Sequence, residues 1–164
     1  MRARLPRPLP GAQATAEQLL AWVANRWRFS PTTYFGPPDA NMILDRVAAG
    51  GRFGSVEYAI VLSQALNAVE IPARRLVLYA DGYHARQDAL HHVTEAWIDD
   101  LGKWILLDGR NGATWRDGDG TPLSFSHRDA KSAFRLIRAG ECSGSQVNGS
   151  SGSISKIPVR KPSQ

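Results

Sequence analysis

Cysteine is almost absent from this sequence. Cys142 is the only one among 164 residues, which excludes an internal disulfide framework and a cysteine-rich metal site. Long apolar runs are absent too, because no stretch approaches the roughly 18 residues that a membrane-spanning helix needs. The first ten residues contain arginine, but the uninterrupted apolar segment of a secretory signal does not follow them. We therefore expect a cytoplasmic protein that does not associate with membranes.

A surplus of positive charge is also missing from the middle of the chain. The net charge is +5. Six basic residues lie near the two ends: Arg2, Arg4, Arg7, Lys156, Arg160 and Lys161. Without these six the balance is −1. Since a nucleic-acid-binding protein carries its basic residues on a folded face, we expect no nucleic acid among the partners.

The remaining composition is typical of one globular domain. Hydrophobic residues make up 43% and charged residues 21%, which suits a single core in a chain of this length. Residues 139–164 contain seven serines, four glycines and no aromatic residue, and cannot bury enough apolar surface to offset the entropy of ordering. We predict a domain over residues 14–140, between a flexible N-terminal segment (1–13) and a flexible Ser/Gly-rich tail (141–164).

Three helices are predicted in the first half of the domain. Apolar residues recur at helical spacing after Thr15, which we expect to cap the first helix. Residues 28–38 contain three prolines and a glycine and are predicted as a loop. Asp39 is expected to cap a short second helix that ends at Gly50 and Gly51. Ser55 is expected to cap a third helix with a buried apolar stripe.

The second half of the domain has the period of strands. Residues 74–80 are rich in strand-forming residues, and residues 91–98 alternate as a strand does. Residues 99–102 form a predicted turn that ends in glycine, and residues 103–107 form the returning strand. Residues 91–108 are therefore a predicted β-hairpin. Helices followed by antiparallel strands indicate the α+β class.

Three polar positions are candidates for chemistry, although each has a simpler explanation by itself. Ser55 begins the third helix and could merely cap it. His91 and His92 begin a strand, where one side chain faces each side of the sheet. Asp108 follows the returning strand, as many turn residues do. Together they suggest more, because a hairpin brings His91 and Asp108 side by side, and a helix N-terminus stabilises negative charge near Ser55. Nucleophile, base and orienting acid need this combination.

Three phrases of the sequence support this interpretation in the same order. Residues 51–74 (GRFGSVEYAIVLSQALNAVEIPAR), residues 91–95 (HHVTE) and residues 104–108 (WILLD) resemble the transglutaminase-like superfamily of papain-type fold. In that family a nucleophilic cysteine opens a helix that ends in a Gly-Ile-Pro-Ala-Arg-like phrase, and Ser55 stands at the cysteine position. The other two phrases are similar to the family's His-x-x-x-Glu strand, with His91 and Glu95, and to its Trp-x-x-x-Asp, with Asp108. The resemblance covers about residues 40–110.

The resemblance implies a papain-like transglutaminase core, with the nucleophile-bearing helix packed on a small antiparallel sheet. It implies amide chemistry on a peptide or protein substrate, by hydrolysis or by transfer of the acyl group to an amine, and it requires no cofactor. The implied catalytic residues are Ser55 as nucleophile, His91 as base and Asp108 as orienting acid. The backbone N–H of Ser55 is the implied oxyanion donor.

The sequence departs from the family at the nucleophile, where serine replaces cysteine. A hydroxyl is far less acidic than a thiol, so no ion pair with histidine can form before the attack. Three interpretations stay open: an active serine enzyme, an inactive module that binds a peptide or partner protein, and a Cys→Ser variant of a thiol enzyme. Glu70 also stands where the family usually has glycine. Cys142 lies in the predicted tail and does not replace the missing thiol.

The sequence does not favour two other kinds of site. His84 and Asp88 together with the histidine pair could suggest a metal cluster, but their spacing matches no standard zinc pattern. The glycine-containing run at residues 50–55 precedes a helix, as phosphate-binding loops do, but it lacks the lysine of a P-loop. We therefore predict no metal and no bound cofactor.

Overall fold

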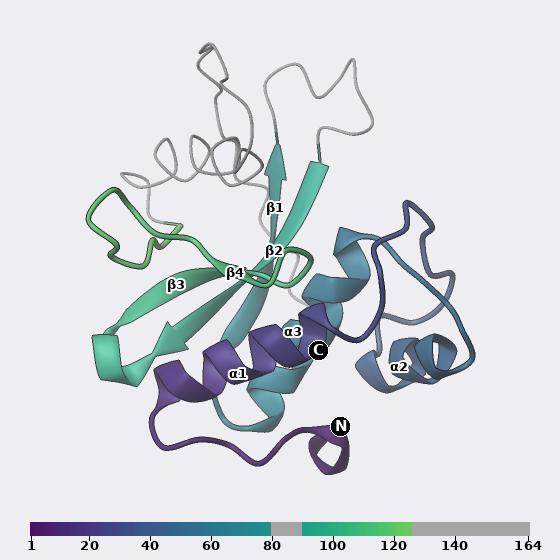
Figure 1. The fold of residues 1–164 in the computed structure, drawn as a ribbon, viewed down its shortest axis with the longest axis horizontal. Coiled ribbons are helices and arrows are strands. Elements are labelled where there is room, and N and C mark those ends of the chain that lie inside the picture. Colours follow the sequence, from purple (N-terminus) through teal and green to yellow (C-terminus); the bar gives the residue numbers. More distant parts are fainter. Residues whose placement is uncertain (80–89, 126–164) are drawn as a thin grey trace, which may run out of the picture.

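Helix α3 lies against one face of an antiparallel sheet in the computed structural model of the chain, which describes residues 1–79 and 90–125 (Figure 1). The helices are α1 (Ala12–Ala24), α2 (Ala40–Ala48) and α3 (Ser55–Ala68), with short 3-10 turns η1 (Arg2–Arg4) and η4 (Asp99–Leu101). The strands are β1 (Ala73–Tyr79), β2 (Leu90–Ile98), β3 (Lys103–Asp108) and β4 (Ala113–Thr114). The α+β class predicted from the sequence is confirmed.

The sheet has the strand order β1-β2-β3-β4, and each neighbouring pair is antiparallel. The predicted hairpin is β2, η4 and β3, in which Thr94 pairs with Leu107 and Ile98 with Lys103. Gly102 closes the turn in the left-handed region, with φ of 59°, which glycine adopts without strain. This register sets the start of β2 beside the end of β3.

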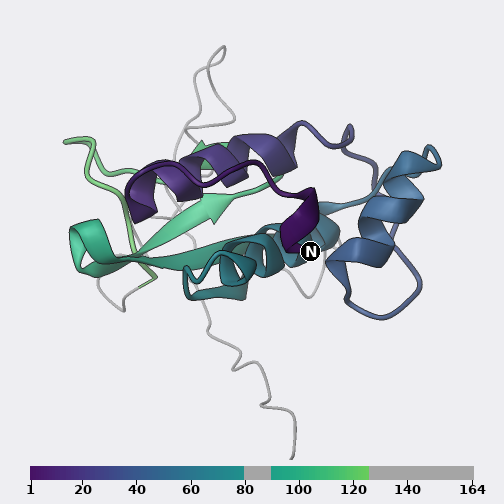
Figure 2. The same cartoon turned by 90° about the horizontal axis from the view of Figure 1, so that it is seen from below.

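The two faces of the sheet bury different clusters. On one face, Ala96, Ile98 and Leu107 pack with the apolar sides of α1 and α3 in the main core. On the other face, Val93 and Leu106 pack with Trp115 of the segment that follows β4. Both views place α2 to one side of the molecule, away from the strands (Figures 1 and 2). Among residues 1–79 and 90–125, every helix is too short or too polar to cross a membrane.

The start of α1 differs from the prediction that Thr15 caps it. The helix begins at Ala12, and its N-cap is Gly11 with φ of 87°. The backbone N–H of Gln13 is bound instead by the carboxylate of Asp100, 2.9 Å away in η4. Thr15 lies within the helix and donates its hydroxyl to the carbonyl of Leu9. A cap supplied from 87 residues along the chain leaves no local signal in the sequence.

The N-terminal segment, which the sequence predicts to be flexible, contacts the rest of the domain. Met1 and Leu5 pack against the main core, and Arg4 forms an ion pair of 2.6 Å with Asp45 of α2. The predicted boundary between residues 13 and 14 falls inside α1. The other predicted boundary, at residue 140, and the whole of the segment 141–164 lie outside the described residues.

Asp39 caps α2 as the sequence predicts, and this cap gives a testable stability effect. Its Oδ1 accepts hydrogen bonds from the backbone N–H of Asn41 (2.8 Å) and of Met42 (3.0 Å). We expect Asp39→Ala to lower the free energy of unfolding by about 1 kcal/mol in urea denaturation, because two N–H groups lose their acceptor. Asp39→Asn should lose only a few tenths, since asparagine is an equally good cap. Equal losses in both variants would contradict the capping role.

Candidate active site

Ser55 is the first residue of α3. The start of this helix is fixed by hydrogen bonds between residues 53–54 and the loop at residues 30–32. Gly54 is the N-cap, so Ser55 does not cap the helix as predicted. The backbone N–H of Gly54 donates to the carbonyl of Thr32 (3.0 Å), and that of Ser30 donates to the carbonyl of Phe53 (3.1 Å). The backbone N–H of Ser55 has no acceptor among the described residues and stays available for a ligand.

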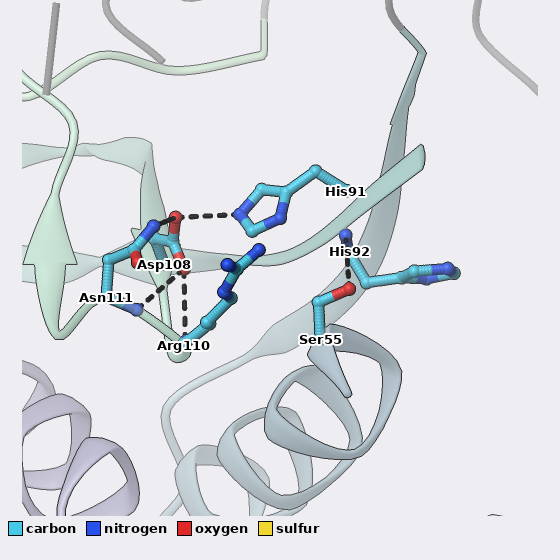
Figure 3. Close-up of polar contacts among 6 residues, drawn as sticks. All are labelled: Ser55, His91, His92, Asp108, Arg110 and Asn111. Carbon is cyan, nitrogen blue, oxygen red and sulfur yellow. Dashed lines mark hydrogen bonds and ion pairs between the residues drawn. The ribbon is translucent and has the colours of Figure 1, made fainter. Parts of the chain in front are cut away.

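The side chain of Ser55 lies against the beginning of β2. Its Oγ accepts a hydrogen bond from the backbone N–H of His92 at 3.4 Å, which is long for such a bond (Figure 3). In the described part of the chain no hydrogen bond joins Ser55 to the ring of His91. The helix N-terminus and the predicted base therefore meet at the same edge of the sheet, although they are not hydrogen-bonded.

His91 and Asp108 are brought together by the hairpin. The Nε2 atom of His91 lies 2.7 Å from Oδ2 of Asp108. The pairing of Thr94 with Leu107 makes these two side chains diagonal neighbours on the face opposite α3, because side chains alternate along each strand. The expectation that the hairpin sets His91 beside Asp108 is confirmed as geometry.

Asp108 is buried and fully hydrogen-bonded. It is 2% exposed, and its Oδ1 accepts the backbone N–H groups of Arg110 (3.0 Å) and Asn111 (3.1 Å). Its Oδ2 accepts the side-chain amide of Asn111 (2.8 Å) in addition to the ring of His91. Burial alone would raise the pKa of Asp108, but the hydrogen bond and charge of His91 and two hydrogen bonds from Asn111 hold it below the ordinary value. Asp108 is thus a carboxylate at neutral pH.

The side chains of the adjacent residues His91 and His92 point in different directions, as alternation along a strand requires. The ring of His91 points to Asp108, whereas the ring of His92 points away from both Asp108 and Ser55 (Figure 3). Burial, together with the smaller effect of the charges of His91 and Arg75, lowers the pKa of His92 from 6.5 to about 4. His92 is therefore neutral at physiological pH, and its contribution to the site is its backbone N–H.

The lowered pKa of His92 predicts how stability depends on pH. Between about pH 6.5 and pH 4 the unfolded chain binds a proton at His92 and the folded chain does not. Stability from this group is present above pH 6.5 and is lost as the pH falls toward 4, by about 2 kcal/mol after allowance for partial exposure. We expect His92→Gln to lose less stability than the unsubstituted chain between pH 7 and pH 4, measured by urea denaturation. Parallel curves for the two proteins would contradict this.

Sequence reasoning missed two residues of the site, Arg110 and Asn111. Both follow Asp108 and bind it, in a turn where an aspartate side chain accepts N–H groups two and three residues ahead. The signal was present, since aspartate followed by glycine after a strand is typical of such turns. The side-chain bond from Asn111 to Oδ2 had no signal of its own.

Glu95, four residues after His91, stands apart from these contacts. It is buried, and it binds the guanidinium of Arg74 at 2.6 Å and the backbone N–H of Phe125 at 2.7 Å. Glu95 therefore links its own strand, β2, to β1 and to the segment after β4. His84 and Asp88, which were weighed as metal ligands, lie outside the described residues. Within the described ranges no three His, Cys, Asp or Glu side chains are grouped as a metal site.

Comparison with known proteins shows the family to which the chain is similar. A family model described as the transglutaminase-like superfamily matches residues 4–109, a range that includes Ser55, His91 and Asp108. No curated protein matches the chain significantly. The structure is similar to that of a "putative cysteine protease" from Cytophaga hutchinsonii, with 17% sequence identity and a TM-score of 0.49. That similarity covers 66% of this chain and 34% of the other, so the chain spans about a third of the other's length.

Proposed function

Because the chain belongs to the transglutaminase-like superfamily, we propose that its domain acts on the amide bonds of peptides or proteins, by hydrolysis or by acyl transfer to an amine. Ser55 occupies the nucleophile position, His91 is the base and Asp108 orients the base. The observation that carries the proposal is the 2.7 Å hydrogen bond from His91 to a buried, ionised Asp108 at the edge where α3 begins.

The hydrogen bond between His91 and Asp108 sets the tautomer of the neutral imidazole. Asp108 is an acceptor only, so the proton of the ring is on Nε2 and the lone pair is on Nδ1. Nδ1 has no hydrogen-bond partner in the described part of the chain. It is thus the atom of His91 that can accept a proton from the nucleophile.

The proposed reaction uses these groups in turn. Oγ of Ser55 attacks the carbonyl carbon of the substrate amide while Nδ1 of His91 takes the hydroxyl proton. The tetrahedral intermediate collapses, the C–N bond breaks, and the imidazolium returns the proton to the leaving amine. Water or a second amine then attacks the acyl-ester and gives its proton to Nδ1 of His91. The bond between the acyl carbon and Oγ breaks, the imidazolium returns the proton to Oγ of Ser55, and the acid or new amide is released.

Negative charge on the carbonyl oxygen is stabilised at the N-terminus of α3. The backbone N–H of Ser55 is the proposed donor, and the positive end of the helix dipole adds to it. Asp108 stabilises the imidazolium that forms at the same time. All these groups belong to the chain itself, so the proposed reaction uses no cofactor.

Serine at the nucleophile position limits this reaction. A thiol next to histidine exchanges its proton before substrate binds, whereas a hydroxyl gives up its proton only during attack. Ser55 must therefore approach Nδ1 of His91 closely, and its Oγ is instead bound to the backbone of His92. We infer slow turnover compared with the same chain carrying cysteine at this position.

The same contact favours a second candidate, a module that binds peptides without cleaving them. With Oγ of Ser55 held by the N–H of His92, the nucleophile is not paired with its base. In this alternative the free N–H of Ser55 and the helix N-terminus bind a carbonyl group of a peptide and no acyl-ester forms.

Covalent labelling of the chain with serine at position 55 separates the two candidates. A fluorophosphonate should label Ser55 slowly, as located by mass spectrometry of the peptide, and labelling should be lost in His91→Asn. His92→Asn is the matched control and should keep the labelling, because that side chain points away from Ser55. The binding module is favoured if Ser55 stays unlabelled while the folded chain still binds peptides.

A further inference from the structure

Arg110 is a positively charged side chain at the edge of the site that the proposed reaction does not use. Its backbone N–H is fixed by Asp108, and its guanidinium carbon lies 3.7 Å from the centre of the Phe29 ring. Figure 3 shows its side chain extending from the turn after Asp108 toward His91. Arg110 is therefore held at both ends, by a hydrogen bond at the backbone and by an aromatic ring at the guanidinium.

Close packing sets this turn against the first turn of α3. A Cβ atom at Gly109 would lie 3.3 Å from the carbonyl oxygen of Tyr58, a tight contact, so the turn and the helix backbone lie close together here. Tyr58 is three residues after Ser55, on the same side of the helix. Phe29 precedes Ser30, whose backbone binds Phe53 beside the same helix start. Arg110 thus lies between the helix that carries the nucleophile and the strand that carries the base.

The guanidinium has no acidic partner in the part of the chain that the structure describes. Arg2, Arg4, Arg74 and Arg116 each form an ion pair with a carboxylate, whereas no carboxylate among residues 1–79 and 90–125 pairs with Arg110. Its stacking on Phe29 covers one face of the guanidinium plane, and its N–H groups lie in that plane. Arg110 can therefore give a paired hydrogen bond to a carboxylate without giving up the contact with Phe29.

We propose that Arg110 selects substrates that carry a carboxylate close to the reacting carbonyl group. The proposal rests on the proposed function, since it names the substrate class of the same site. A substrate carboxylate held by Arg110 lies beside the start of α3, so its carbonyl carbon is brought to residue 55. An acidic side chain next to the scissile amide and a free terminal carboxylate both meet this requirement.

Two small alkylating agents test the selection directly, because they differ mainly in charge. The protein is the full chain with Ser55→Cys and Cys142→Ser, which leaves one thiol at the site. Second-order rate constants are measured with iodoacetate, which carries a carboxylate, and with iodoacetamide, which is neutral. Arg110→Gln should lower the iodoacetate-to-iodoacetamide ratio roughly fivefold, as removal of a unit charge several ångströms away in partly solvated surroundings predicts. The iodoacetamide rate itself should change by less than about twofold.

Two further variants separate selection by Arg110 from a structural role. Arg110→Lys keeps the charge and should retain most of the ratio. Arg26→Gln removes another arginine that stacks on an aromatic ring, 4.7 Å above Trp22, and should leave the ratio unchanged. High salt should reduce the ratio in the parent, because it screens a partly exposed charge.

The outcomes for this proposal and for the proposed function are distinct. An unchanged ratio in Arg110→Gln overturns the role of Arg110, whether or not the thiol is activated. If the iodoacetamide rate does not depend on His91, the proposed base is wrong, and the ratio still reports on Arg110. An equal fall of the ratio in Arg110→Gln and Arg26→Gln overturns selection by Arg110, since only the general charge of the protein would matter.

Discussion

Replacing Ser55 by cysteine should produce a thiol that reacts with iodoacetamide about 10 to 100 times faster at pH 6 than the same thiol in the unfolded chain. A free cysteine has a pKa near ~8.5 and is almost entirely protonated at that pH. At position 55 the N-terminus of α3 and the adjacent imidazole, held by Asp108, favour the thiolate and lower that pKa. The measurement is a stopped alkylation series in the Cys142→Ser background, followed by mass spectrometry.

Matched histidine variants tell whether this acceleration comes from the site. His91→Asn should remove most of it, because the imidazolium partner is lost. His92→Asn should change the rate by less than about threefold, since its ring points away and is neutral at this pH. An acceleration that survives in His91→Asn would mean that the helix N-terminus alone activates the thiol and that His91 is not the base.

Asp108→Asn should remove most of the activation while leaving the fold intact. Oδ1 of Asp108 binds two backbone N–H groups, so the amide of asparagine must keep its carbonyl oxygen there. Its NH₂ group then takes the place of Oδ2, which accepts from both His91 and Asn111. The side-chain amide of Asn111 can turn its oxygen toward this group, whereas Nε2 of His91 has to become an acceptor, and the ring proton moves to Nδ1. His91 can no longer take a proton from the nucleophile. Comparable removal of the acid in serine proteases lowers the rate on the order of 10⁴-fold, a guide to the loss in the serine form.

Asn111→Ala is the control for this variant. It removes a hydrogen bond to the same oxygen of Asp108 without changing which nitrogen of His91 carries the proton. The alkylation rate in Asn111→Ala should stay within about threefold of the parent, because the loss is one hydrogen bond. If Asp108→Asn and Asn111→Ala lower the rate equally in protein shown to be folded by circular dichroism, the tautomer argument is wrong.

Much of the site could be predicted because its residues lie in regular elements. The alternation of residues 91–98 and the glycine of the turn at Gly102 were enough to set the hairpin and to place His91 beside Asp108. The apolar stripe of α3 located Ser55 at the start of a buried helix. In these elements the hydrophobic periodicity of the sequence matches the face that is buried in the fold. The periodicity therefore predicts on which face of the helix or strand a residue lies.

The parts that could not be predicted depend on contacts between distant segments. The carboxylate of Asp100 reaches α1 across the fold, and the stacking of Arg110 on Phe29 joins two loops that are 81 residues apart. Met1 and Leu5 lie in the segment predicted to be flexible, and their contacts with the main core have no signal in its proline- and arginine-rich composition. Neither periodicity nor composition records such contacts.

The most direct test of the central claim is a titration of the thiol in the chain with Ser55→Cys and Cys142→Ser. Ultraviolet absorbance of the thiolate, followed from acidic to alkaline pH, gives the fraction ionised without any reagent or substrate. We predict that the thiol ionises well below its usual pKa of ~8.5 and that His91→Asn moves the transition back toward that value. A transition near the ordinary value, unchanged by His91→Asn, would contradict the assignment of position 55 and His91 as a coupled nucleophile and base.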